Sequence, residues 1–434
     1  MILVLGGTTE GRLAVKVLDE SGKPYFYSTR GDSQQVSCRH GERVSGGMDA
    51  EKMEAFCRAH SVRLLVDAAH PFAVRLHETV EQVSRSLQLP VVRFERIYPP
   101  RTDDVIWCAD YQEAVRRLKE DGITRLLALT GVQTIGKLRD FWADDTLQPT
   151  CWFRILDREE SVSLAVRQGF DVNRLVFYHE DVPETELLEQ LKPQAILTKE
   201  SGESGGFVEK LEAARSGEIP VYAVCCPSLP SDFITVTGIH GLRKAVERLL
   251  PDFYPLRSGY TTGACATAAA KAALIRLLTG ESLSEVRFRI PDGEELSLPL
   301  ASVCQETDTS ATAAVVKDAG DDPDVTHRSV IEAKVAFSAQ SGIRFLQGKG
   351  VGKVTLPGLG LPVGEPAINP VPRQMMMREL SALYSGGLEV TISVPGGEEL
   401  ALRTFNPKLG IVGGISIIGT SGIVRPFSSE AFVE

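Results

Sequence analysis

Eight short apolar segments, each of the length of a buried strand, recur through the first 250 residues of this 434-residue chain. Stretches with helical spacing lie between most of them, so strand and helix alternate. Such alternation predicts parallel sheets with helices on both faces. We therefore expect an α/β fold with two Rossmann-like lobes, residues 1–129 and 130–250, which meet near Thr130 and Gly131. The expected strands are Ile2–Leu5, Tyr25–Ser28, Leu64–Val66, Val91–Phe94, Arg125–Leu129, Leu175–Tyr178, Ala195–Thr198 and Val221–Val224.

The chain continues well beyond this pattern. A single core stops growing at about 250–300 residues, so a further domain is expected. The segment PDFYP at 251–255 predicts a linker over 251–256, followed by a domain at 257–434. The block RSGYTTGACATAAAKAA (257–273) joins a loop rich in glycine and threonine to an alanine run of high helix propensity. Thr261 or Thr262 is the expected N-cap, and the first N–H groups of such a helix suit an anion.

Charge and composition limit the classes of partner. The formal net charge of −10 argues against general nucleic-acid binding, although a local cluster of Arg and Lys can still bind a polyanionic small molecule. No apolar run reaches the roughly 18–20 residues that span a bilayer, and Ile2–Leu5 is too short for a signal peptide. We therefore expect a cytoplasmic protein with no membrane partner. The eight cysteines include no C-x-x-C pair, so no metal site is predicted.

The turn GGTTEGR at 6–12 resembles a phosphate-binding loop. It fits neither the dinucleotide fingerprint, which has glycine where Thr8 stands, nor a P-loop, which has Lys at the position of Arg12. A tight turn without ligand is the alternative. Its place after the first strand favours a nucleotide, and the second strand ends in Arg30 rather than in an acid, which favours the 2′-phosphate of NADPH. The residues expected at the cofactor are Gly6, Gly7, Thr8, Thr9, Glu10, Gly11, Arg12, Arg30, Thr130 and Gly131.

Three further stretches carry residues suited to a substrate. DAAHPFA (67–73) follows a buried strand and places a histidine at its carboxyl edge, although a lone histidine is often structural. RFERIYPP (93–100) places Arg93 and Arg96 at a strand exit, suited to carboxylates, with a solvated surface as the alternative. TKESGESGG (198–206) is a Ser/Gly loop that can wrap an anionic group. The residues expected to bind substrate are His70, Phe72, Arg93, Lys199, Glu200, Ser201 and Gly202.

Taken together and in order, GGTTEGR, DAAHPFA, LTGVQTIGKL and TKESGESGG make residues 1 to about 248 similar to precorrin-6A reductase of cobalamin biosynthesis. The resemblance implies hydride transfer from NADPH or NADH to the C18–C19 double bond of the corrin-precursor macrocycle, in the cleft between the two lobes. The chain departs from the family pattern at VCCPSLP (224–230), where an Arg-Pro pair is usual. A nicotinamide oxidoreductase acting on another substrate is the competing interpretation.

The second half resembles cobalt-precorrin-5B C1-methyltransferase. Four blocks carry the resemblance, YTTGACA (260–266), VVKDAGDDPDVTH (315–327), GKGVGKVTLPGLGLPVGEPAINPVPR (348–373) and FNPKLGIVGGISIIGTSGIVRPFS (405–428). It implies an α+β domain that moves a methyl group from S-adenosyl-L-methionine to C1 in the anaerobic route. The product of that reaction is the substrate of the reductase, so the chain is expected to join consecutive steps on cobalt-precorrin tetrapyrroles.

Members of this second family continue into another lobe. We therefore expect residues 257–434 to be a fragment, to be completed by a separate chain that supplies this lobe, or to be a non-catalytic module that binds macrocycle. The residues expected at the substrate or S-adenosylmethionine are Tyr260, Thr261, Thr262, Gly263, Lys317, Asp318, Asp321, Asp322 and Asn369. The aspartates either accept N–H groups of their own turn or hold a cation or a substrate nitrogen. Cys265 is expected to be a buried apolar residue rather than a reactive thiol.

Overall fold

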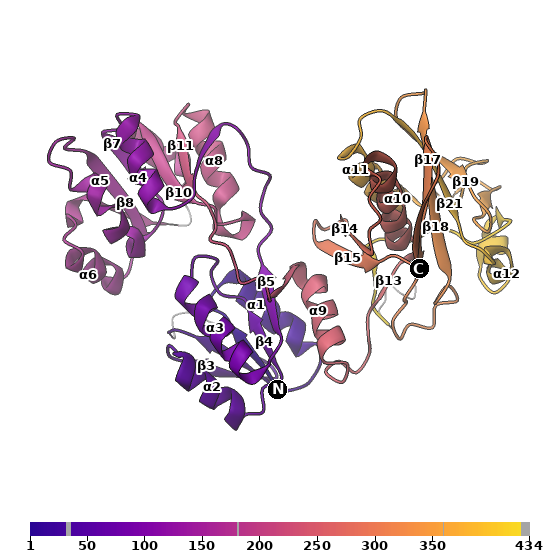
Figure 1. Cartoon of the computed structure of the whole chain (residues 1–434), viewed down its shortest axis with the longest axis horizontal. Coiled ribbons are helices and arrows are strands. Elements are labelled where there is room, and N and C mark those ends of the chain that lie inside the picture. The colour runs from indigo at the N-terminus through magenta and orange to yellow at the C-terminus, as the bar shows by residue number, and fades with distance from the viewer. Residues whose placement is uncertain (32–35, 180–181, 359, 427–434) are drawn as a thin grey trace.

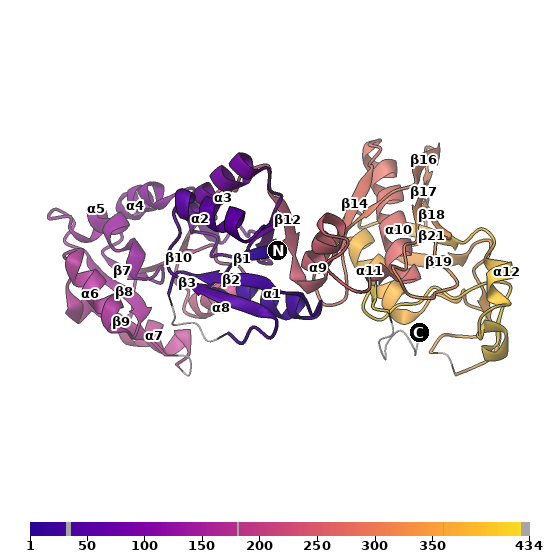
Figure 2. The same ribbon diagram turned by 90° about the horizontal axis from the view of Figure 1, so that it is seen from below.

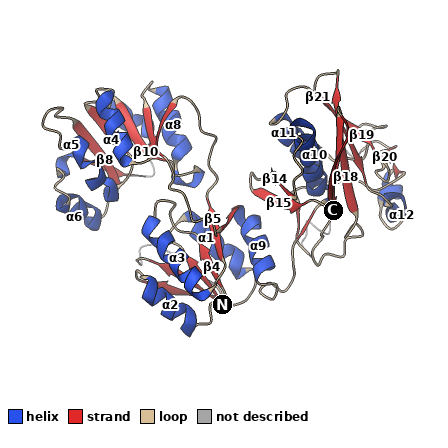
Figure 3. Cartoon of the chain, viewed as in Figure 1, coloured by secondary structure: helices blue, strands red, loops and turns tan. Residues whose placement is uncertain are grey.

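The computed structural model describes residues 1–31, 36–179, 182–358 and 360–426, which form two parallel-sheet lobes and a third, α+β domain. Figures 1 and 2 show the first lobe between the second lobe and the third domain. Helices lie on both faces of the two parallel sheets, as Figure 3 shows by colour. Among the described residues, none of the helices combines the length and apolar composition that a membrane crossing requires.

The first lobe is a six-stranded parallel sheet in the order β12-β5-β4-β1-β2-β3. Its central strands are fully buried, which explains why their sequences are continuous apolar runs rather than alternating ones. Its elements are β1 (Ile2–Leu5), α1 (Thr9–Asp19), β2 (Tyr25–Thr29), β3 (Gly41–Ser45), α2 (Ala50–Ala59), β4 (Leu64–Asp67), α3 (Val74–Leu87), β5 (Val91–Glu95), β12 (Ile234–Thr237) and α9 (Gly238–Leu249).

The second lobe repeats this arrangement in the order β6-β11-β10-β7-β8-β9. Every strand pair in it is parallel, as in the first lobe. Its elements are β6 (Val105–Cys108), α4 (Tyr111–Glu120), β7 (Arg125–Ala128), α5 (Arg139–Trp142), β8 (Thr150–Leu156), α6 (Glu159–Arg167), β9 (Leu175–Tyr178), α7 (Glu184–Leu191), β10 (Ala195–Lys199), α8 (Phe207–Ser216) and β11 (Val221–Val224), with short 3₁₀ turns between them.

The chain passes between the two lobes twice, and each passage leads into an edge strand of the sheet that it enters. After β5 the chain crosses to the second sheet and begins it with the edge strand β6, and after β11 it returns to the first sheet with the edge strand β12. The change of sheet therefore falls at 96–104 and again at 225–233. The boundary predicted from the sequence lies at residue 130, because β6 and β12 are four-residue strands beside proline-rich segments and neither was predicted as a strand.

The predicted linker packs against the first lobe. Phe253 and Tyr254 are buried in its core, and the Tyr254 hydroxyl donates a hydrogen bond to the Val17 carbonyl at 3.0 Å. The Arg243 guanidinium of α9 lies 4.2 Å from the Tyr254 ring centroid. Residues 251–256 therefore connect the domains as an ordered, partly buried segment.

The third domain packs one long helix against a five-stranded sheet in the order β16-β17-β18-β21-β19. The alanine run forms α10 (Thr262–Thr279), and thirteen of its residues are buried because small side chains allow helix and sheet to approach closely. The other elements are β13 (Gly259–Tyr260), β14 (Glu285–Arg289), β15 (Glu295–Pro299), β16 (Ser302–Thr307), β17 (Ser310–Val316), β18 (Val330–Ser338), β19 (Ile343–Gln347), β20 (Lys353–Val354), α11 (Pro370–Ser381), β21 (Gly387–Ser393), α12 (Gly397–Ala401), β22 (Ile411–Val412) and β23 (Ile423–Val424).

Candidate active site

Each parallel sheet has one point at which the strand order reverses. In the first sheet this point lies between β1 and β4, and in the second it lies between β7 and β10. Doubly wound folds bind ligands at the carboxyl ends of the strands at such points. The predicted loops 6–12 and 67–73 follow β1 and β4, and the predicted loops 130–131 and 199–206 follow β7 and β10. All four loops therefore occupy the positions where this architecture places ligands.

The loop after β1 is shaped by Tyr27. A Cβ atom at Gly6 or Gly11 would lie 2.3 Å or 2.6 Å from the Tyr27 side chain, so both glycines are required by packing inside the lobe. The Gly7 N–H donates to the Tyr27 hydroxyl at 3.1 Å, whereas a Cβ on Gly7, whose φ is +96°, would meet no atom within 4 Å. Tyr27 was not predicted from the sequence, because it is a buried residue within the second strand. Gly7 is the glycine of this loop that faces open space.

Thr8 begins the helix α1. Its hydroxyl accepts a hydrogen bond from the Gly11 N–H at 3.0 Å and donates one to the Ala68 carbonyl at 2.6 Å, which ties the β1 loop to the β4 loop. The N–H groups of Thr9 and Glu10 lie in the first turn, before the helix can supply them with a carbonyl partner. Arg12 is exposed and donates to the Thr9 hydroxyl at 3.1 Å.

Glu10 and Arg96 connect the two lobes. Arg96 follows β5, and its Nε lies 3.1 Å from the Glu10 carboxylate with both side chains buried. The Arg96 Nη1 donates to the Ser201 carbonyl of the second lobe at 2.7 Å, and the Ser204 hydroxyl donates to Glu10. Gly202 has φ +68°, and a Cβ there would lie 2.8 Å from the Arg96 Cβ. Glu10, expected at the cofactor, is therefore engaged in holding the carboxyl edges of the two sheets together.

His70, Phe72 and Lys199 meet at this junction from opposite lobes. Lys199 Nζ lies 5.5 Å from the Phe72 ring centroid, and the His70 and Phe72 rings are 5.9 Å apart. Burial, followed by the nearby charges of Lys199 and Arg96, lowers the pKa of His70 to about 3, so its imidazole is neutral. Burial and the charges of Arg96 and Lys137 lower the pKa of Lys199 to about 8. Three residues expected to bind substrate are thus brought together.

Arg93 takes another role than the one expected. Its side chain is fully buried, Nε lies 3.0 Å from the Glu95 carboxylate, and Nη1 donates to the Asp67 carboxylate at 3.1 Å and to the Ala69 carbonyl at 2.9 Å. It has no exposed surface to offer a substrate carboxylate. Burial raises the pKa of Asp67, but hydrogen bonding to His77 and the charge of Arg93 outweigh it, and the pKa is lowered. This group fixes the loop that carries His70.

The neighbouring Glu200 is likewise held inside the protein. Its carboxylate accepts two hydrogen bonds from Arg101, both at 2.9 Å, and one from the Cys226 N–H at 2.8 Å. It therefore anchors the VCCPSLP segment to the end of β10. The hydroxyl of Ser201 donates to the Gly205 carbonyl at 3.1 Å and shapes the same loop.

The remaining cofactor residues lie at the edges of this region. Arg30 is exposed, and within the described residues it makes no hydrogen bond or ion pair. Thr130 is buried and shares a 2.6 Å hydrogen bond with the Thr134 hydroxyl, while Gly131 has φ +81° and open space at the position of a Cβ.

In the third domain the predicted methyltransferase residues gather at the N-terminus of α10. Thr261 is the N-cap, and its hydroxyl accepts from the Ala264 N–H at 3.1 Å. The Gly263 N–H, however, donates to the Ile418 carbonyl at 2.8 Å, and the Thr262 hydroxyl accepts from the Ile418 N–H at 2.9 Å. The segment around Ile418 thus covers the helix start, and the N–H groups of Gly263 and Ala264 are satisfied within the protein.

The aspartate loop packs directly beside this helix start. Asp318 accepts from the Gly320 N–H at 2.9 Å, and Asp321 accepts from the Arg257 N–H at 2.7 Å. The backbone N–H of Asp322 donates to the Ala319 carbonyl at 3.4 Å. Lys317, which is buried, donates to Asp324, the aspartate whose other oxygen accepts from the Thr326 N–H at 2.7 Å. The carboxylates of Asp318 and Asp321 therefore accept backbone N–H groups of the chain itself, and Asp324 pairs with Lys317.

Tyr260, Asn369 and Cys265 complete the cluster. The Tyr260 ring lies 4.7 Å from Lys244 Nζ of α9, and the Tyr260 N–H donates to the Asp318 carbonyl at 2.7 Å. Asn369 precedes α11, and its N–H donates to the Ile417 carbonyl at 2.9 Å. Cys265 is fully buried, and burial raises the pKa of its thiol to about 12, as expected for an apolar role.

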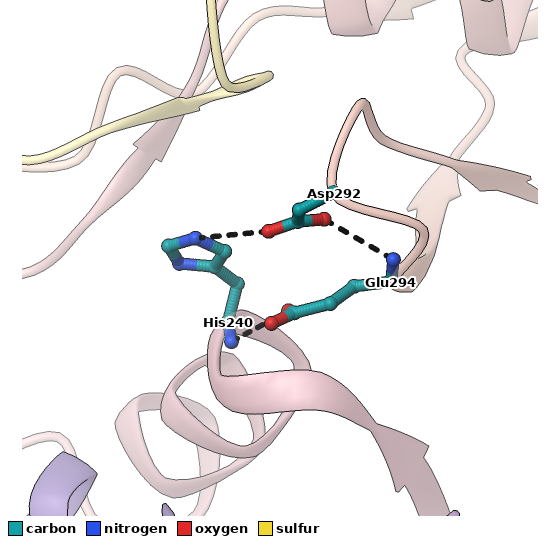
Figure 4. Close-up of side chains that lie close together, drawn as sticks. All are labelled: His240, Asp292 and Glu294. Atoms are coloured by element: carbon teal, nitrogen blue, oxygen red, sulfur yellow. Dashed lines mark hydrogen bonds and ion pairs between the residues drawn. The ribbon is translucent and has the colours of Figure 1, made fainter. Parts of the chain in front are cut away.

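A further cluster, not foreseen from the sequence, joins the first lobe to the third domain. The Glu294 carboxylate accepts hydrogen bonds from the N–H groups of Ile239 and His240 at 2.7 and 2.8 Å and so caps α9 from another domain (Figure 4). His240 Nε2 lies 3.8 Å from Asp292. A Cβ at Gly238 would lie 2.0 Å from the Glu294 carboxyl carbon, so glycine is required there.

Comparison with known proteins identifies both parts. A family model described as precorrin-6x reductase CbiJ/CobK matches residues 1–248, and one described as CbiD matches residues 251–426. The chain belongs to the precorrin-6x reductase family. Residues 251–426 match the CbiD family model and are similar to proteins of cobalamin biosynthesis.

The curated relatives support the second assignment. Cobalt-precorrin-5B C(1)-methyltransferases of Pseudomonas paraeruginosa and Burkholderia cenocepacia are each 57% identical over 184 residues, 41% of this chain and 50% or 51% of their own length. The chain thus spans about half the length of the curated relatives it matches. Among solved structures, a cobalamin biosynthesis protein (cbiD) of Archaeoglobus fulgidus is 35% identical and covers 40% of this chain and 56% of its own, with a TM-score of 0.32. A CobK precorrin-6A reductase is 22% identical and covers 58% of this chain and 98% of its own, with a TM-score of 0.48.

Proposed function

We propose that residues 1–250 reduce cobalt-precorrin-6A to cobalt-precorrin-6B with a nicotinamide cofactor, at the junction of the two parallel-sheet lobes. The observation that carries the proposal is the meeting of the two strand-order reversal points, which brings His70 and Phe72 of one lobe against Lys199 of the other. The family to which residues 1–248 belong supplies the class of reaction.

The loop after β1 has the features that a nucleotide phosphate needs. Gly7 leaves open space, and the first-turn N–H groups of α1 are oriented as at other phosphate-binding helix starts. The exposed Arg30, which follows β2, is proposed to pair with a 2′-phosphate, so NADPH is the proposed cofactor, with Thr130 and Gly131 on the opposite side of the junction. When bound, the nicotinamide supplies the hydride.

The macrocycle is a polycarboxylate, so cations at the junction are the groups that recognise it. Lys199 is partly exposed and carries no carboxylate partner among the described residues, unlike Arg93 and Arg96. Arg12 is exposed beside the same loop. Phe72 offers an apolar face against which a flat ring can pack. These residues are therefore proposed to hold and orient the substrate.

For residues 257–426 we propose participation in S-adenosylmethionine-dependent C1 methylation of cobalt-precorrin-5B. The proposal rests on the identity to the curated methyltransferases over this segment. Tyr260 and Asn369 are the proposed ligand contacts, in a region where all four characteristic blocks meet. Because the chain spans about half of those relatives, the proposed active form includes the part of the relatives that this segment does not match.

A second candidate for this segment is a module that binds macrocycle without methylating it. The closed start of α10 favours it, because the N–H groups of Gly263 and Ala264 already have partners. The module would then deliver macrocycle to the reductase lobes.

One anaerobic experiment tests both parts. The purified chain is incubated with cobalt-precorrin-5B, S-adenosylmethionine and NADPH, and separately with cobalt-precorrin-6A and NADPH, and products are identified by mass. Reduction of cobalt-precorrin-6A is expected, and its absence with correctly folded protein would overturn the reductase proposal. Methylated product that forms only after addition of the other half of a relative supports the shared methyltransferase. No methylation under either condition, together with tight macrocycle binding, supports the binding module.

A further inference from the structure

Reduction of a carbon–carbon double bond requires the transfer of a hydride and the transfer of a proton. A hydride, with both electrons of the new C–H bond, goes to one carbon, and a proton goes to its neighbour. The nicotinamide supplies the hydride when bound, and a separate group must donate the proton. The source must hold a dissociable proton at the junction and be able to release it near neutral pH.

Most titratable groups at the junction are unsuited to this task. His70 is neutral, and its Nδ1 accepts the Phe72 N–H at 3.2 Å, so the proton on its Nε2 belongs to a neutral imidazole, which is a very weak acid. Arg96 is a guanidinium, which does not deprotonate in proteins. The Tyr98 hydroxyl is committed to Glu95 at 3.0 Å, and burial raises its pKa.

The thiols beyond Tyr98 are no better placed. Cys225 and Cys226 lie in the segment anchored by Glu200, and burial raises the pKa of both thiols. Their protons are held more tightly than those of an ordinary cysteine. The cations that face Lys199 are Arg96 from the end of β5 and Lys137 from the turn after β7, and His70 faces it from the loop after β4.

Lys199 differs from all of these. It ends β10 at the reversal point of the second sheet, its Nζ lies over Phe72 of the first lobe, and it has no carboxylate partner among the described residues. We propose that the Lys199 ammonium donates the proton to the macrocycle carbon next to the one that receives the hydride. The resulting neutral amine regains a proton from solvent after the product leaves.

The electrostatics of the site suit this assignment. Burial and neighbouring cations lower the pKa of Lys199 to about 8, so the ammonium is populated at neutral pH and is a stronger acid than an ordinary lysine. The inference rests on the proposed reductase function and adds to it the identity of the acid. A lysine that only binds a substrate carboxylate would give the same geometry, so the test must separate the two roles.

The test compares Lys199→Arg with wild type in single-turnover reduction of cobalt-precorrin-6A at saturating NADPH, from pH 6 to 10. Arginine keeps the positive charge but does not release its proton. We expect the reduction rate of the wild type to fall above pH about 8. The rate of Lys199→Arg is expected to be lower by about 10²-fold or more and to show no such fall. Its KM for the macrocycle is expected to change less than tenfold. Lys199→Met is expected to lose rate to a similar extent.

Lys210→Met provides the matched control. The pKa of Lys210 is also lowered to about 8 by burial, but its Nζ donates to the Gly205 carbonyl at 2.8 Å behind the 199–206 loop. This variant is expected to retain the fall in rate above pH 8. Loss of that fall in Lys210→Met, or a Lys199→Arg rate within threefold of wild type with an unchanged pH profile, would overturn the assignment of Lys199. Absence of reduction by the wild type would instead overturn the reductase proposal, and the assignment of Lys199 with it.

Discussion

The lobe junction of the reductase and the start of α10 in the third domain are built from similar sequence, yet they differ in what they leave available. Both begin with a strand, a turn rich in glycine and threonine, and a helix capped by a threonine hydroxyl. At α1 Gly7 faces open space, and the nearby Lys199 has no acidic partner in the part of the chain that the structure describes. At α10 the backbone of Ile418, which is distant in sequence, forms hydrogen bonds with the first turn of the helix. The same local motif therefore gives an accessible site in one place and a covered one in the other.

This contrast separates what a motif specifies from what the fold specifies. A threonine cap and its glycines fix the path of the backbone. Whether the N–H groups of that turn meet a ligand or a carbonyl depends on a chain segment far away in sequence. The start of α1 is consequently open at Gly7, whereas the start of α10 is covered by the segment around Ile418.

The largest expected effect is on relative activity. The isolated chain is expected to reduce cobalt-precorrin-6A while methylating cobalt-precorrin-5B at a rate at least about 10³-fold lower, because methyl transfer requires donor and acceptor held in line by both walls of a site. The measurement is product per enzyme for each reaction, with and without the other half of a methyltransferase relative. Rapid methylation by the chain alone would mean that residues 257–426 hold an entire site and that the covered start of α10 opens.

The next largest effect is expected on the stability that the contact between the two lobes provides. Arg96→Met leaves the buried Glu10 carboxylate unpaired, which is expected to cost about 3 to 5 kcal/mol of unfolding free energy. The three tryptophans, Trp107, Trp142 and Trp152, all lie in the second lobe, so urea unfolding followed by tryptophan fluorescence reports on this lobe alone.

Lys317→Met is the matched variant in the third domain, since it breaks the ion pair of the buried Lys317 with the partly exposed Asp324 near α10. It should leave the tryptophan transition where it is in wild type, while Arg96→Met lowers its midpoint. Equal shifts of the tryptophan midpoint in both variants would show that the lobes and the third domain unfold as one unit. The stability of the lobe junction could then not be separated from that of the third domain.

The sequence predicted the strands that carry the junction and most of the loops on it. Buried runs such as Ile2–Leu5 and Ala195–Thr198 were found, because strands covered on both faces are continuously apolar. The half-buried strands β3 and β12 lack such a run and were missed. Partners far apart in the chain, such as Glu10 with Ser204, could not be predicted because they depend on how the lobes dock.

The same limit explains Arg93 and Gly11. Arginine at a strand exit and glycine in a turn were interpreted as ligand contacts. In the structure Arg93 is surrounded by Asp67 and Glu95, and Gly11 is packed against Tyr27. A short sequence motif indicates which side chains make specific contacts. It does not indicate whether those contacts are to a ligand or to other residues of the protein.

A smaller effect is expected at the cofactor. If Arg30 pairs with the 2′-phosphate, Arg30→Ala should weaken NADPH binding by about 1.5 to 3 kcal/mol and leave NADH binding nearly unchanged. Titration of nicotinamide fluorescence measures both affinities. Arg39→Ala, an exposed arginine of the same lobe, is the control and should change neither. Equal weakening of NADH and NADPH would place the adenosine end of the cofactor elsewhere.

The smallest effect concerns the contact between the two enzyme parts, at Glu294. Burial, with a further contribution from Asp292, raises the pKa of Glu294 to about 7, although the N–H groups of Ile239 and His240 oppose the shift. An acid with a raised pKa holds its proton more tightly in the folded state, so its contribution to stability is present below the ordinary pKa of about 4.5 and is lost as pH rises through about 7.

Glu294→Gln removes this titration while keeping an oxygen that accepts a hydrogen bond. We expect the unfolding free energy of the wild type, relative to Glu294→Gln, to fall by about 1 to 2 kcal/mol between pH 5 and pH 8, with solvent screening holding the change below the full value of the shift. Urea unfolding followed by far-ultraviolet circular dichroism at pH 5, 6, 7 and 8 measures it, with the exposed neighbour Glu295→Gln as control. Glu295→Gln should keep the pH dependence of the wild type. If Glu294→Gln keeps it as well, Glu294 remains ionised throughout this range, and the cap on α9 joins the reductase to the third domain as a permanent charge.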